Sequence, residues 1–505
     1  MRRIGIGLLL LLVAAFGSCA LLLRLGLLPE RFAVNVPVLH ALFGRGVEAP
    51  PPSVVGARFR VPEGFSVGLF AEGIPNARFL RPTPAGDVLV SQPRDGRVWL
   101  LERDADGDGR ADARRALLEG LNRPHGMELH EDWLYVAEGD AVGRVRFDPG
   151  ARRAEGPFER VVTGLPEGGN HWTRTLRFGP DGWMYVSVGS SCNGCLEQDP
   201  RRAALLRFRP DGSGEEIYAT GLRNAVGFDW RPGTDELYAT DNGRDLLGDD
   251  FPPCELDRVV QGGFYGWPFA HGDRVPDPDL GQGRDAEIAA SIPPAHAFRA
   301  HNAPLGISFL RSPTAPPAYR GAALVALHGS WNRTRKDGYE VVSLHWRADG
   351  SIEERHFLTG FLEDDDVIGR PVDVAEGPDG AIYVSDDYAG AVYRVTHGGA
   401  ARTAAAPTPV AEPAPDPLSV LAPGELRLQA ERGRELFDRN DCAACHDPAR
   451  ATPGMVPKEL RGLASRYDVA SLAAFLEAPT PPMPVFAFSA EDKRDLAVHL
   501  LTEYR

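Results

Sequence analysis

The chain has 505 residues, a net charge of −15 and an apolar content of 43%. This is longer than one hydrophobic core usually serves, so we expect two or three domains. The excess of acidic residues disfavours nucleic acids and anionic lipid surfaces as partners, because phosphate contacts need clustered lysine and arginine.

Residues 1–28 have the pattern of a targeting or anchoring segment. Arg2 and Arg3 precede an apolar run over residues 4–23, which Arg24 closes. A run of about 20 apolar residues can cross a bilayer as a helix, and basic residues ahead of it favour export of the following chain. We expect an uncleaved membrane anchor, and the alternative is a lipoprotein signal cleaved before Cys19. Either interpretation predicts a periplasmic protein held at the bacterial inner membrane.

One pattern recurs over residues 54–398, after a spacer at 29–53. A turn with glycine, aspartate or proline leads into a short apolar strand, at residues 85–90, 131–136, 180–186, 233–238, 320–325 and 378–384. The centres of successive strands are 45, 50, 53, 87 and 58 residues apart. Repeats of this length are typical of β-propeller blades. Six copies predict an all-β, six-bladed propeller. An array of β-sandwiches would explain the turns and strands, but not six similar segments.

An acidic loop lies within the first repeat. Asp104, Asp106, Asp108 and Asp112 alternate with small residues, and a glycine stands at the sixth position, as at the start of a calcium loop. The twelfth position is Arg115, where an EF-hand needs a bidentate glutamate. A short calcium loop and a plain solvated acidic turn both remain open.

Cys192 and Cys195 lie three residues apart in a loop of the predicted propeller, and Cys254 is left over. In an oxidising compartment the pair predicts a disulfide. The alternative is a redox-active CxxC motif, but no thioredoxin-like βαβ pattern surrounds it.

Residues 399–423 are rich in alanine and proline and predict a semi-extended linker. Beyond it, residues 424–505 predict a small all-α domain, because residues 426–437 and 490–501 have apolar side chains at helical spacing.

This tail contains a CxxCH motif. Cys442 and Cys445 can bind the two vinyl groups of one haem, and His446 then becomes an axial iron ligand. Met483 is followed by proline and precedes the last predicted helix, so this tail resembles class I cytochromes c, where such a methionine is the sixth ligand. Met455 is the other candidate, but little chain separates it from His446.

The predicted propeller resembles the quinoprotein glucose/sorbosone dehydrogenases, and its sorbosone branch most. These are six-bladed propellers that bind pyrroloquinoline quinone (PQQ) and calcium. The resemblance rests on GNHW at 169–172, FGPDG at 178–182, GLRN at 221–224, DNGR at 241–244, GGFYGWP at 262–268, HNAPLG at 301–306, GSWNR at 329–333 and GRPVDV at 369–374.

The resemblance implies roles for residues of these motifs. His171 matches the family's base, which takes a hydroxyl proton while hydride leaves the substrate. Arg223, Asn224 and Arg370 match residues that bind the cofactor's carboxylates. The carbonyls of Gly243 and Arg244 match calcium ligands.

Three positions depart from the family pattern. Asn170 stands where the family has an acidic residue before its base, and Val372 stands where it often has a second arginine. The family's lysine has no firm match, although Arg333 or Lys336 could substitute for it.

These residues predict a periplasmic quinoprotein dehydrogenase that oxidises an aldose or a related sugar aldehyde or alcohol. Electrons would pass from PQQ to the fused haem and on to an acceptor of the respiratory chain. One alternative is a propeller that binds carbohydrate or protein without PQQ chemistry, fused to an electron carrier. Another is a calcium-dependent lactonase, which would have no use for a haem.

Overall fold

The computed structural model describes residues 35, 46–398, 417–418, 421–447, 450, 460, 463, 467–477, 479, 483–484 and 486–504. The chain divides into two compact units, Met1–Ala404 and Ala405–Arg505. The predicted anchor at 1–28 and most of the predicted linker at 399–423 lie outside the described residues. Within the described ranges, no helix has both the length and the apolar character needed to cross a membrane.

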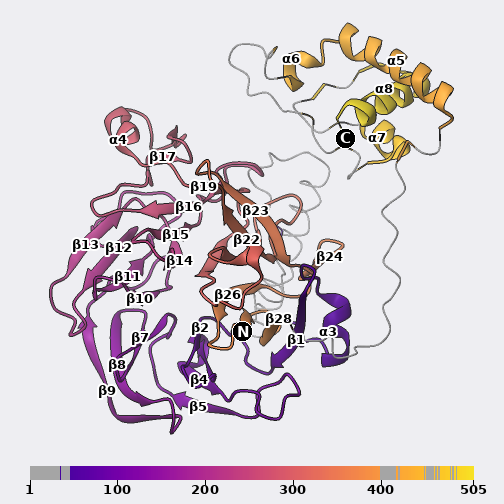
Figure 1. The fold of residues 1–505 in the computed structure, drawn as a ribbon. Helices are drawn as coiled ribbons and strands as arrows, with labels where there is room; N and C mark the ends of the chain where they lie inside the picture. The colour runs from indigo at the N-terminus through magenta and orange to yellow at the C-terminus, as the bar shows by residue number, and fades with distance from the viewer. Residues whose placement is uncertain are drawn as a thin grey trace, which may run out of the picture. The chain divides into compact units, whose positions relative to one another are not determined.

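The first unit is a propeller of six four-stranded antiparallel sheets, which confirms the predicted fold class (Figure 1). Blade 1 consists of β2 (Leu80–Pro82), β3 (Val88–Gln92), β4 (Arg97–Leu101) and β5 (Arg114–Leu118), and blade 2 of β6 (Met127–His130), β7 (Trp133–Ala137), β8 (Ala141–Asp148) and β9 (Arg153–Thr163). Blade 3 consists of β10 (Leu176–Phe178), β11 (Met184–Val188), β12 (Ala204–Phe208) and β13 (Glu216–Thr220), and blade 4 of β14 (Ala225–Trp230), β15 (Leu237–Asp241), β16 (Cys254–Val259) and β19 (His296–Phe298). Blade 5 consists of β20 (Pro304–Phe309), β21 (Ala323–Leu327), β22 (Glu340–Trp346) and β23 (Ile352–Leu358), and blade 6 of β26 (Pro371–Glu376), β27 (Ile382–Asp386), β28 (Ala391–His397) and β1 (Phe65–Ala71).

The ring closes where the first strand of the chain completes the last blade. β1 pairs antiparallel with β28, with Phe65 opposite His397 and Val67 opposite Val395. Figure 1 shows the indigo β1 beside the orange β28. This closure joins the two ends of the propeller chain and leaves no open gap between the first and last blades.

Short elements lie between the blades. They are α3 (Pro52–Arg58), η2 (Pro93–Asp95), β17 (Ala270–His271), β18 (Val275–Pro276), α4 (Asp285–Ala290), η3 (Pro317–Tyr319), β24 (Leu362–Glu363) and β25 (Asp366–Val367). The longest insertion, which holds β17, β18 and α4, separates the third and fourth strands of blade 4.

The recurring turns of the sequence become tight hairpins between the first and second strands of a blade. In blade 3, Gly182 has a φ of 76°, a conformation that favours glycine, and the Asp181 carboxylate accepts a hydrogen bond from the backbone N–H of Trp183. The equivalent Gly380 in blade 6 has a φ of 77°. The second strands that follow, β11 and β27, are buried along their whole length, since neighbouring blades cover both faces.

The second unit is a small helical domain, as predicted. It contains α5 (Pro423–Arg439), α6 (Ala443–His446), α7 (Val469–Phe475) and α8 (Ala490–Glu503). Helices α5 and α8 approach closely at Gly433, where a Cβ atom would lie 2.1 Å from the carbonyl oxygen of Asp495. Leu436, Phe437 and Leu496 are buried in the shared core of these helices.

Candidate functional site

A polar cavity of about 220 Å³ lies in the propeller at the end of the central channel where β14, β20 and β26 begin. It collects side chains from segments more than 290 residues apart, because the inner strands of a propeller converge on one axis. Its lining residues are Arg78, Asn170, His171, Trp172, Thr173, Arg223, Asn224, Val226, Asn242, Gly243, Asp245, Cys254, His301, Ala303, Leu305, His328, Gly329, Trp331 and Arg370.

The cavity brings together most of the propeller residues singled out in the sequence. His171, Arg223, Asn224, Arg370 and Gly243 all line it, although they come from three different parts of the chain. Sequence distance alone does not predict this grouping, which follows from the ring closure of the blades.

His171 lies in the connection that precedes β10, and Ser190 fixes its ring. Its Nδ1 lies 3.0 Å from the carbonyl oxygen of Ser190 and 2.8 Å from the Ser190 hydroxyl oxygen. The hydroxyl donates its own proton to the carbonyl of Cys192 at 2.8 Å. Both Ser190 oxygens can therefore only accept from His171, so Nδ1 carries the proton and Nε2 is the free base.

Burial, with a further contribution from the nearby Arg223, lowers the pKa of His171 to about 3. The imidazole is therefore neutral at neutral pH, as a proton acceptor must be. Gly189 makes room for it, because a Cβ there would lie 2.6 Å from the Cβ of His171 and 2.7 Å from Oδ1 of Asn224.

Arg223 and Asn224 lie in the turn between β13 and β14, where a buried carboxylate holds their backbone. Asp241 accepts hydrogen bonds from both N–H groups, at 2.7 Å from Arg223 and 2.5 Å from Asn224. The Arg223 guanidinium donates to Oδ2 of Asp245 at 2.8 Å and to Oδ1 of Asn193 at 2.8 Å. The turn thereby presents one cation and one amide to the cavity.

Arg370 directly precedes β26 and reaches the cavity from blade 6. Its backbone N–H donates to Asp386 at 2.9 Å, and its guanidinium donates to the carbonyls of His328 at 3.2 Å and Gly329 at 3.3 Å. Gly369 is tightly enclosed, because a Cβ there would lie 2.5 Å from Oδ2 of Asp386. These neutral carbonyl contacts leave the charge of Arg370 without a carboxylate partner among the described residues.

A third arginine of the cavity, Arg78, was missed by sequence reasoning. Asp387, which is buried, pairs with Nη1 of Arg78 at 2.8 Å and with Nε2 of His328 at 3.0 Å. Burial alone would raise the pKa of the Asp387 carboxyl, but His328 and Arg78 hold it well below its usual range. No recognisable motif marks these three residues. Arg78 lies just before β2, and His328 and Asp387 directly follow β21 and β27, the second strands of blades 5 and 6.

Val372 lies below the cavity in the channel. It is fully buried against Phe79, Val226 and Leu305, which come from inner segments of three other blades. Val226 and Leu305 also line the cavity, so this apolar cluster forms its floor. A charged side chain at position 372 would have to enter that cluster.

Arg333 and Lys336 are not among the lining residues, and the terminal nitrogens of both side chains donate elsewhere. Arg333 donates to the carbonyls of Ala300, at 3.1 Å, and Asp249. Lys336 donates to the carbonyl of Asp365 at 2.7 Å. The third arginine of the lining is Arg78 instead.

Gly243 and Arg244, the two predicted calcium-ligand positions of the DNGR motif, have different surroundings. Gly243 lines the cavity. The Arg244 side chain instead forms ion pairs with Asp277 at 2.6 Å and with Asp279. Calcium binding by the two carbonyls stays a prediction.

In the acidic loop of blade 1, the aspartate carboxylates accept hydrogen bonds from backbone N–H groups of the same loop. Oxygens of Asp104, Asp106 and Asp108 lie within 4.8 Å of one another. Asp104 accepts from the N–H of Gly107 at 2.7 Å, and its other oxygen pairs with Arg394 at 3.0 Å. Asp112 accepts from the N–H of Ala105, also within the loop, at 3.2 Å. The choice between a calcium loop and a solvated turn stays open.

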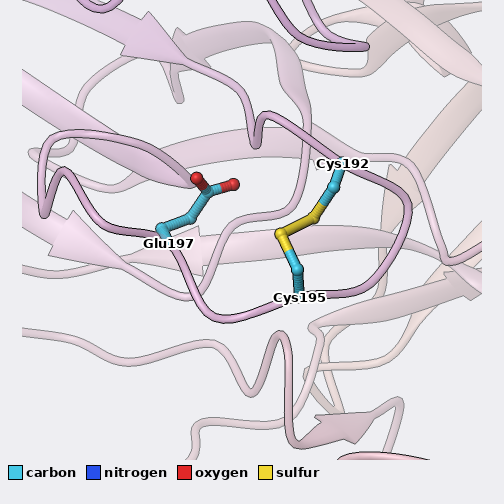
Figure 2. A group of neighbouring side chains, drawn as sticks. All are labelled: Cys192, Cys195 and Glu197. Atoms are coloured by element: carbon cyan, nitrogen blue, oxygen red, sulfur yellow. A yellow bond between two sulfur atoms is a disulfide. The ribbon is translucent and has the colours of Figure 1, made fainter.

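The predicted Cys192–Cys195 disulfide is present, with the Glu197 carboxylate beside it (Figure 2). Since both sulfurs are bonded to each other, neither is a thiolate that could bind a metal.

In the helical domain the CxxCH motif forms one short helical turn. The N–H groups of Cys445 and His446 both donate to the carbonyl of Cys442, at 3.2 and 3.1 Å. Neither cysteine is in a disulfide. Cys442 and Met483 pack against the same apolar core, whereas Met455 lies outside the described residues. The choice between the two methionines as sixth ligand stays a prediction.

Comparison with known families divides the chain in the same way. The family described as Glucose / Sorbosone dehydrogenase matches residues 135–394, and the family described as Cytochrome c matches residues 430–502. An uncharacterized protein of Borreliella burgdorferi is 35% identical over 358 residues, which cover 68% of this chain and 91% of that protein.

Two further relatives have named activities. An aldose sugar dehydrogenase of Escherichia coli is 26% identical over 350 residues, covering 63% of this chain and 84% of the relative. A pyrroloquinoline quinone-dependent pyranose dehydrogenase of Coprinopsis cinerea is 26% identical over 347 residues, covering 58% of this chain and 45% of the relative.

Solved structures share the propeller fold. A Trichoderma reesei enzyme of carbohydrate-active enzyme family AA12 aligns with a TM-score of 0.59 at 21% identity, covering 69% of this chain and all of that one. The holo PQQ domain of the Coprinopsis cinerea pyranose dehydrogenase aligns with a TM-score of 0.57 at 22% identity, covering 67% of this chain and 97% of that domain.

Proposed function

Because this chain belongs to the glucose/sorbosone dehydrogenase family and ends in a cytochrome c domain, we propose that it is a PQQ-dependent sugar dehydrogenase that reduces its own haem. The substrate class is an aldose or a related sugar aldehyde or alcohol. The observation that carries the proposal is a neutral histidine, His171, in a cavity lined by three arginines.

The chemistry of the cavity fits PQQ, a flat tricarboxylate. Arg78, Arg223 and Arg370 contribute three guanidinium groups, and Asp245 is the single carboxylate of the lining. Planar guanidinium groups bind carboxylates in pairs and stay charged at any working pH. The Arg78 side chain lines the cavity, and its Nε is buried without a hydrogen-bond partner among the described residues. When bound, PQQ supplies an acceptor for the hydride that leaves the sugar carbon.

His171 would act as the general base of the reaction. Its Nε2 is unprotonated and takes the proton of the sugar hydroxyl as the C–H bond breaks. The Nδ1–H bond to Ser190 keeps the ring in this tautomer and orientation. Gly243 and Arg244 would supply the carbonyl oxygens for calcium, a hard cation that prefers oxygen ligands.

The second unit would take the electrons. Cys442 and Cys445 would hold the haem covalently, and His446 and Met483 would bind its iron, a ligand pair that suits electron transfer. The final acceptor would be a component of the respiratory chain. Export to the periplasmic side of the inner membrane is supported by the basic and apolar residues at 1–28 and by the disulfide.

The test uses the full haem-bearing chain, produced without PQQ. Trp172 and Trp331 line the cavity, so titration with PQQ and Ca²⁺ should quench tryptophan fluorescence with a saturable curve. A panel of sugars should then reduce the haem, which is followed by its absorbance. His171→Ala should retain PQQ binding and lose activity by roughly 100-fold or more, the usual effect of losing a general base.

Arg370→Ala should do the opposite and weaken PQQ binding first, since its charge lacks a carboxylate partner in the described structure. If the wild-type chain does not bind PQQ, the propeller is a binding module beside an electron carrier. If it binds PQQ and His171→Ala is fully active, the proposed base is wrong.

A further inference from the structure

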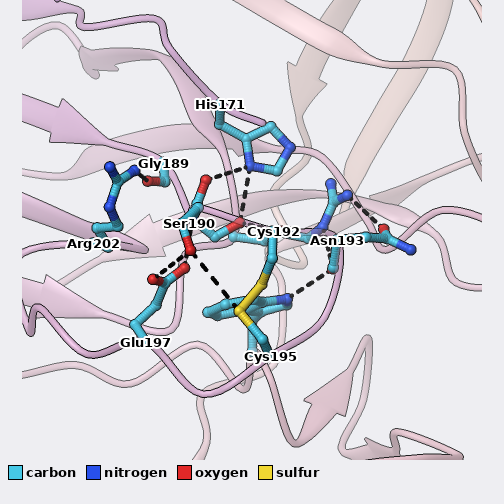
Figure 3. The surroundings of a disulfide bond; sticks show 11 residues. His171, Gly189, Ser190, Cys192, Asn193, Cys195, Glu197 and Arg202 are labelled. Atoms are coloured by element: carbon cyan, nitrogen blue, oxygen red, sulfur yellow. Dashed lines mark hydrogen bonds between the residues drawn. A yellow bond between two sulfur atoms is a disulfide. The ribbon is translucent and has the colours of Figure 1, made fainter. Parts of the chain in front are cut away.

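The loop 190–197, closed by the Cys192–Cys195 disulfide, contacts two side chains of the cavity, His171 through Ser190 and Arg223 through Asn193. Figure 3 shows the ring of His171 hydrogen-bonded to Ser190, the first residue of this loop. The loop follows β11 and Gly189, and its backbone is hydrogen-bonded to the segments that contain His171 and Arg223. Ser190 N–H donates to the carbonyl of Arg223 at 2.8 Å, and Asn170 N–H donates to the carbonyl of Ser191 at 2.8 Å.

At one end of this loop, Ser190 determines the state of the base. It is fully buried, and its hydroxyl is oriented by the carbonyl of Cys192, the first half-cystine. An oxygen whose proton is already committed can only accept, so it selects the Nδ1–H tautomer of His171. The disulfide ring thus acts on Nε2 through two successive hydrogen bonds.

In the middle of this loop, Asn193 binds the guanidinium group of Arg223. It lies inside the ring, between the two half-cystines, and it contacts Arg223 twice. Its carbonyl accepts from Nε of Arg223 at 3.0 Å, and its side-chain Oδ1 accepts from Nη2 at 2.8 Å. Its side-chain amide donates to the carbonyl of Asp245 at 3.0 Å, so the guanidinium and its carboxylate partner share one anchor.

The outer side of the loop is fixed as well. The Glu197 carboxylate accepts from the N–H of Ser191 at 2.5 Å and from its hydroxyl at 2.8 Å (Figure 3). Gly194 allows close packing, since a Cβ there would lie 2.7 Å from Nε of Arg244. The ring therefore has little freedom to shift relative to either side chain that it contacts.

We propose that the disulfide-closed loop 190–197 is a positioning device for the dehydrogenase reaction, in which Ser190 orients the base His171 and Asn193 orients the cofactor-binding Arg223. Ser190 and Asn193 are positioning residues, since they act through side chains that touch the reactants. The proposal rests on the proposed function for its kinetic consequences. Its structural consequence, the tautomer of His171, does not depend on that function.

The proposal predicts that mutations at Ser190 and at Asn193 have different effects on the reaction. Ser190→Ala should lower kcat on the order of tenfold or more, because misplaced bases lose rate steeply, and should leave the Kd for PQQ unchanged. Asn193→Ala should weaken PQQ binding by a similar factor and leave kcat at saturating PQQ nearly unchanged. The double variant Cys192→Ser/Cys195→Ser should show both defects.

Conservative variants and a matched control distinguish positioning from loss of folding. Ser190→Thr restores a hydroxyl, and Asn193→Asp restores the acceptor for Arg223, so both should recover most of the lost function. Ser213→Ala removes a hydroxyl from an exposed turn of the same blade and should change nothing. If the double cysteine variant fails to fold, Ser190→Ala and Asn193→Ala still decide the question.

Nitrogen NMR of histidine-labelled protein gives the readout that needs no activity. The His171 signals, assigned with His171→Gln, should report the Nδ1–H tautomer in the wild type. In Ser190→Ala the backbone carbonyl of residue 190 still accepts from Nδ1, so the tautomer should persist, but the Nδ1 chemical shift should change because the hydroxyl acceptor is lost. If the wild type shows this tautomer but neither binds PQQ nor oxidises sugars, the proposed function fails and the positioning geometry stands. An unchanged Nδ1 signal and an unchanged kcat in Ser190→Ala would overturn the positioning role.

Discussion

Replacing Asp387 by asparagine tests the charge network that sequence reasoning missed. The carboxylate is about 10% exposed and pairs with Arg78, also about 10% exposed, at 2.8 Å. Removing one partner of such a buried pair costs about 3–5 kcal/mol of unfolding free energy, because the other charge stays buried without compensation. Asparagine keeps one acceptor oxygen, so we expect the lower end of this range.

Urea unfolding of the full chain can measure this loss. All eight tryptophans lie between Trp99 and Trp346, so fluorescence reports on the propeller alone. The matched control is Asp379→Asn, which removes a carboxylate that pairs with Arg394 and is 49% exposed. Exposed pairs contribute about 0–1 kcal/mol, so this variant should unfold close to the wild-type midpoint.

Asp387→Asn should lower the stability of the protein but raise its affinity for PQQ. With Asp387 neutralised, the net charge around Arg78 rises by one unit, so a tricarboxylate should bind more tightly even though the protein is less stable. If Asp387→Asn lost less than about 1 kcal/mol of unfolding free energy, as Asp379→Asn should, then breaking the Arg78–Asp387 pair would not leave a buried charge without compensation, and the reasoning would be wrong. A loss of PQQ affinity would refute the electrostatic part of the reasoning.

Three further predictions concern pH, the haem and electron transfer. His171 has a pKa of about 3 in the folded state, lowered by burial, against about 6.5 unfolded, so only the unfolded chain binds this proton between those values. Stability should fall as pH drops through this window, and His171→Gln should reduce the slope by up to about 1.4 kcal/mol per pH unit, measured by unfolding at several pH values. Met483→Ala should keep the haem but lower its potential in redox titration; an unchanged potential and spectrum would exclude Met483 as the sixth ligand. In stopped-flow experiments, sugar should reduce the haem at a rate independent of protein concentration, because a linker of about 23 residues can span on the order of 70 Å; a rate that scales with concentration would mean transfer between molecules.

The blade architecture could be predicted because each turn is a local signal. Residues 180–182 and 378–380 carry the same proline, aspartate and glycine, and both form the tight turn before a buried strand. The disulfide was equally local, since Cys192 and Cys195 are neighbours in the loop. His171 and Arg370 could be placed in one site only through the family resemblance, because nothing in their spacing of 199 residues shows that they meet.

The rest of the site could not be predicted, since it depends on contacts between blades. Arg78 and Asp387 are 309 residues apart and pair because blade 6 closes against blade 1. Val372 was noted only as a missing arginine. Its burial with Phe79 and Leu305 shows that this position belongs to the channel floor, which no local pattern of the chain reveals.

The charges of the cavity connect cofactor binding to the strength of the base. The first cause of the low pKa of His171 is burial, and the next is the positive charge of Arg223. Three guanidinium groups against one lining carboxylate leave an excess of positive charge, which both attracts a polyanion and disfavours protonation of His171. Binding of a tricarboxylate would offset the charge of Arg223, and the pKa of His171 would move back towards its ordinary value. The base would then be strong enough to accept a hydroxyl proton only when the hydride acceptor is also in place.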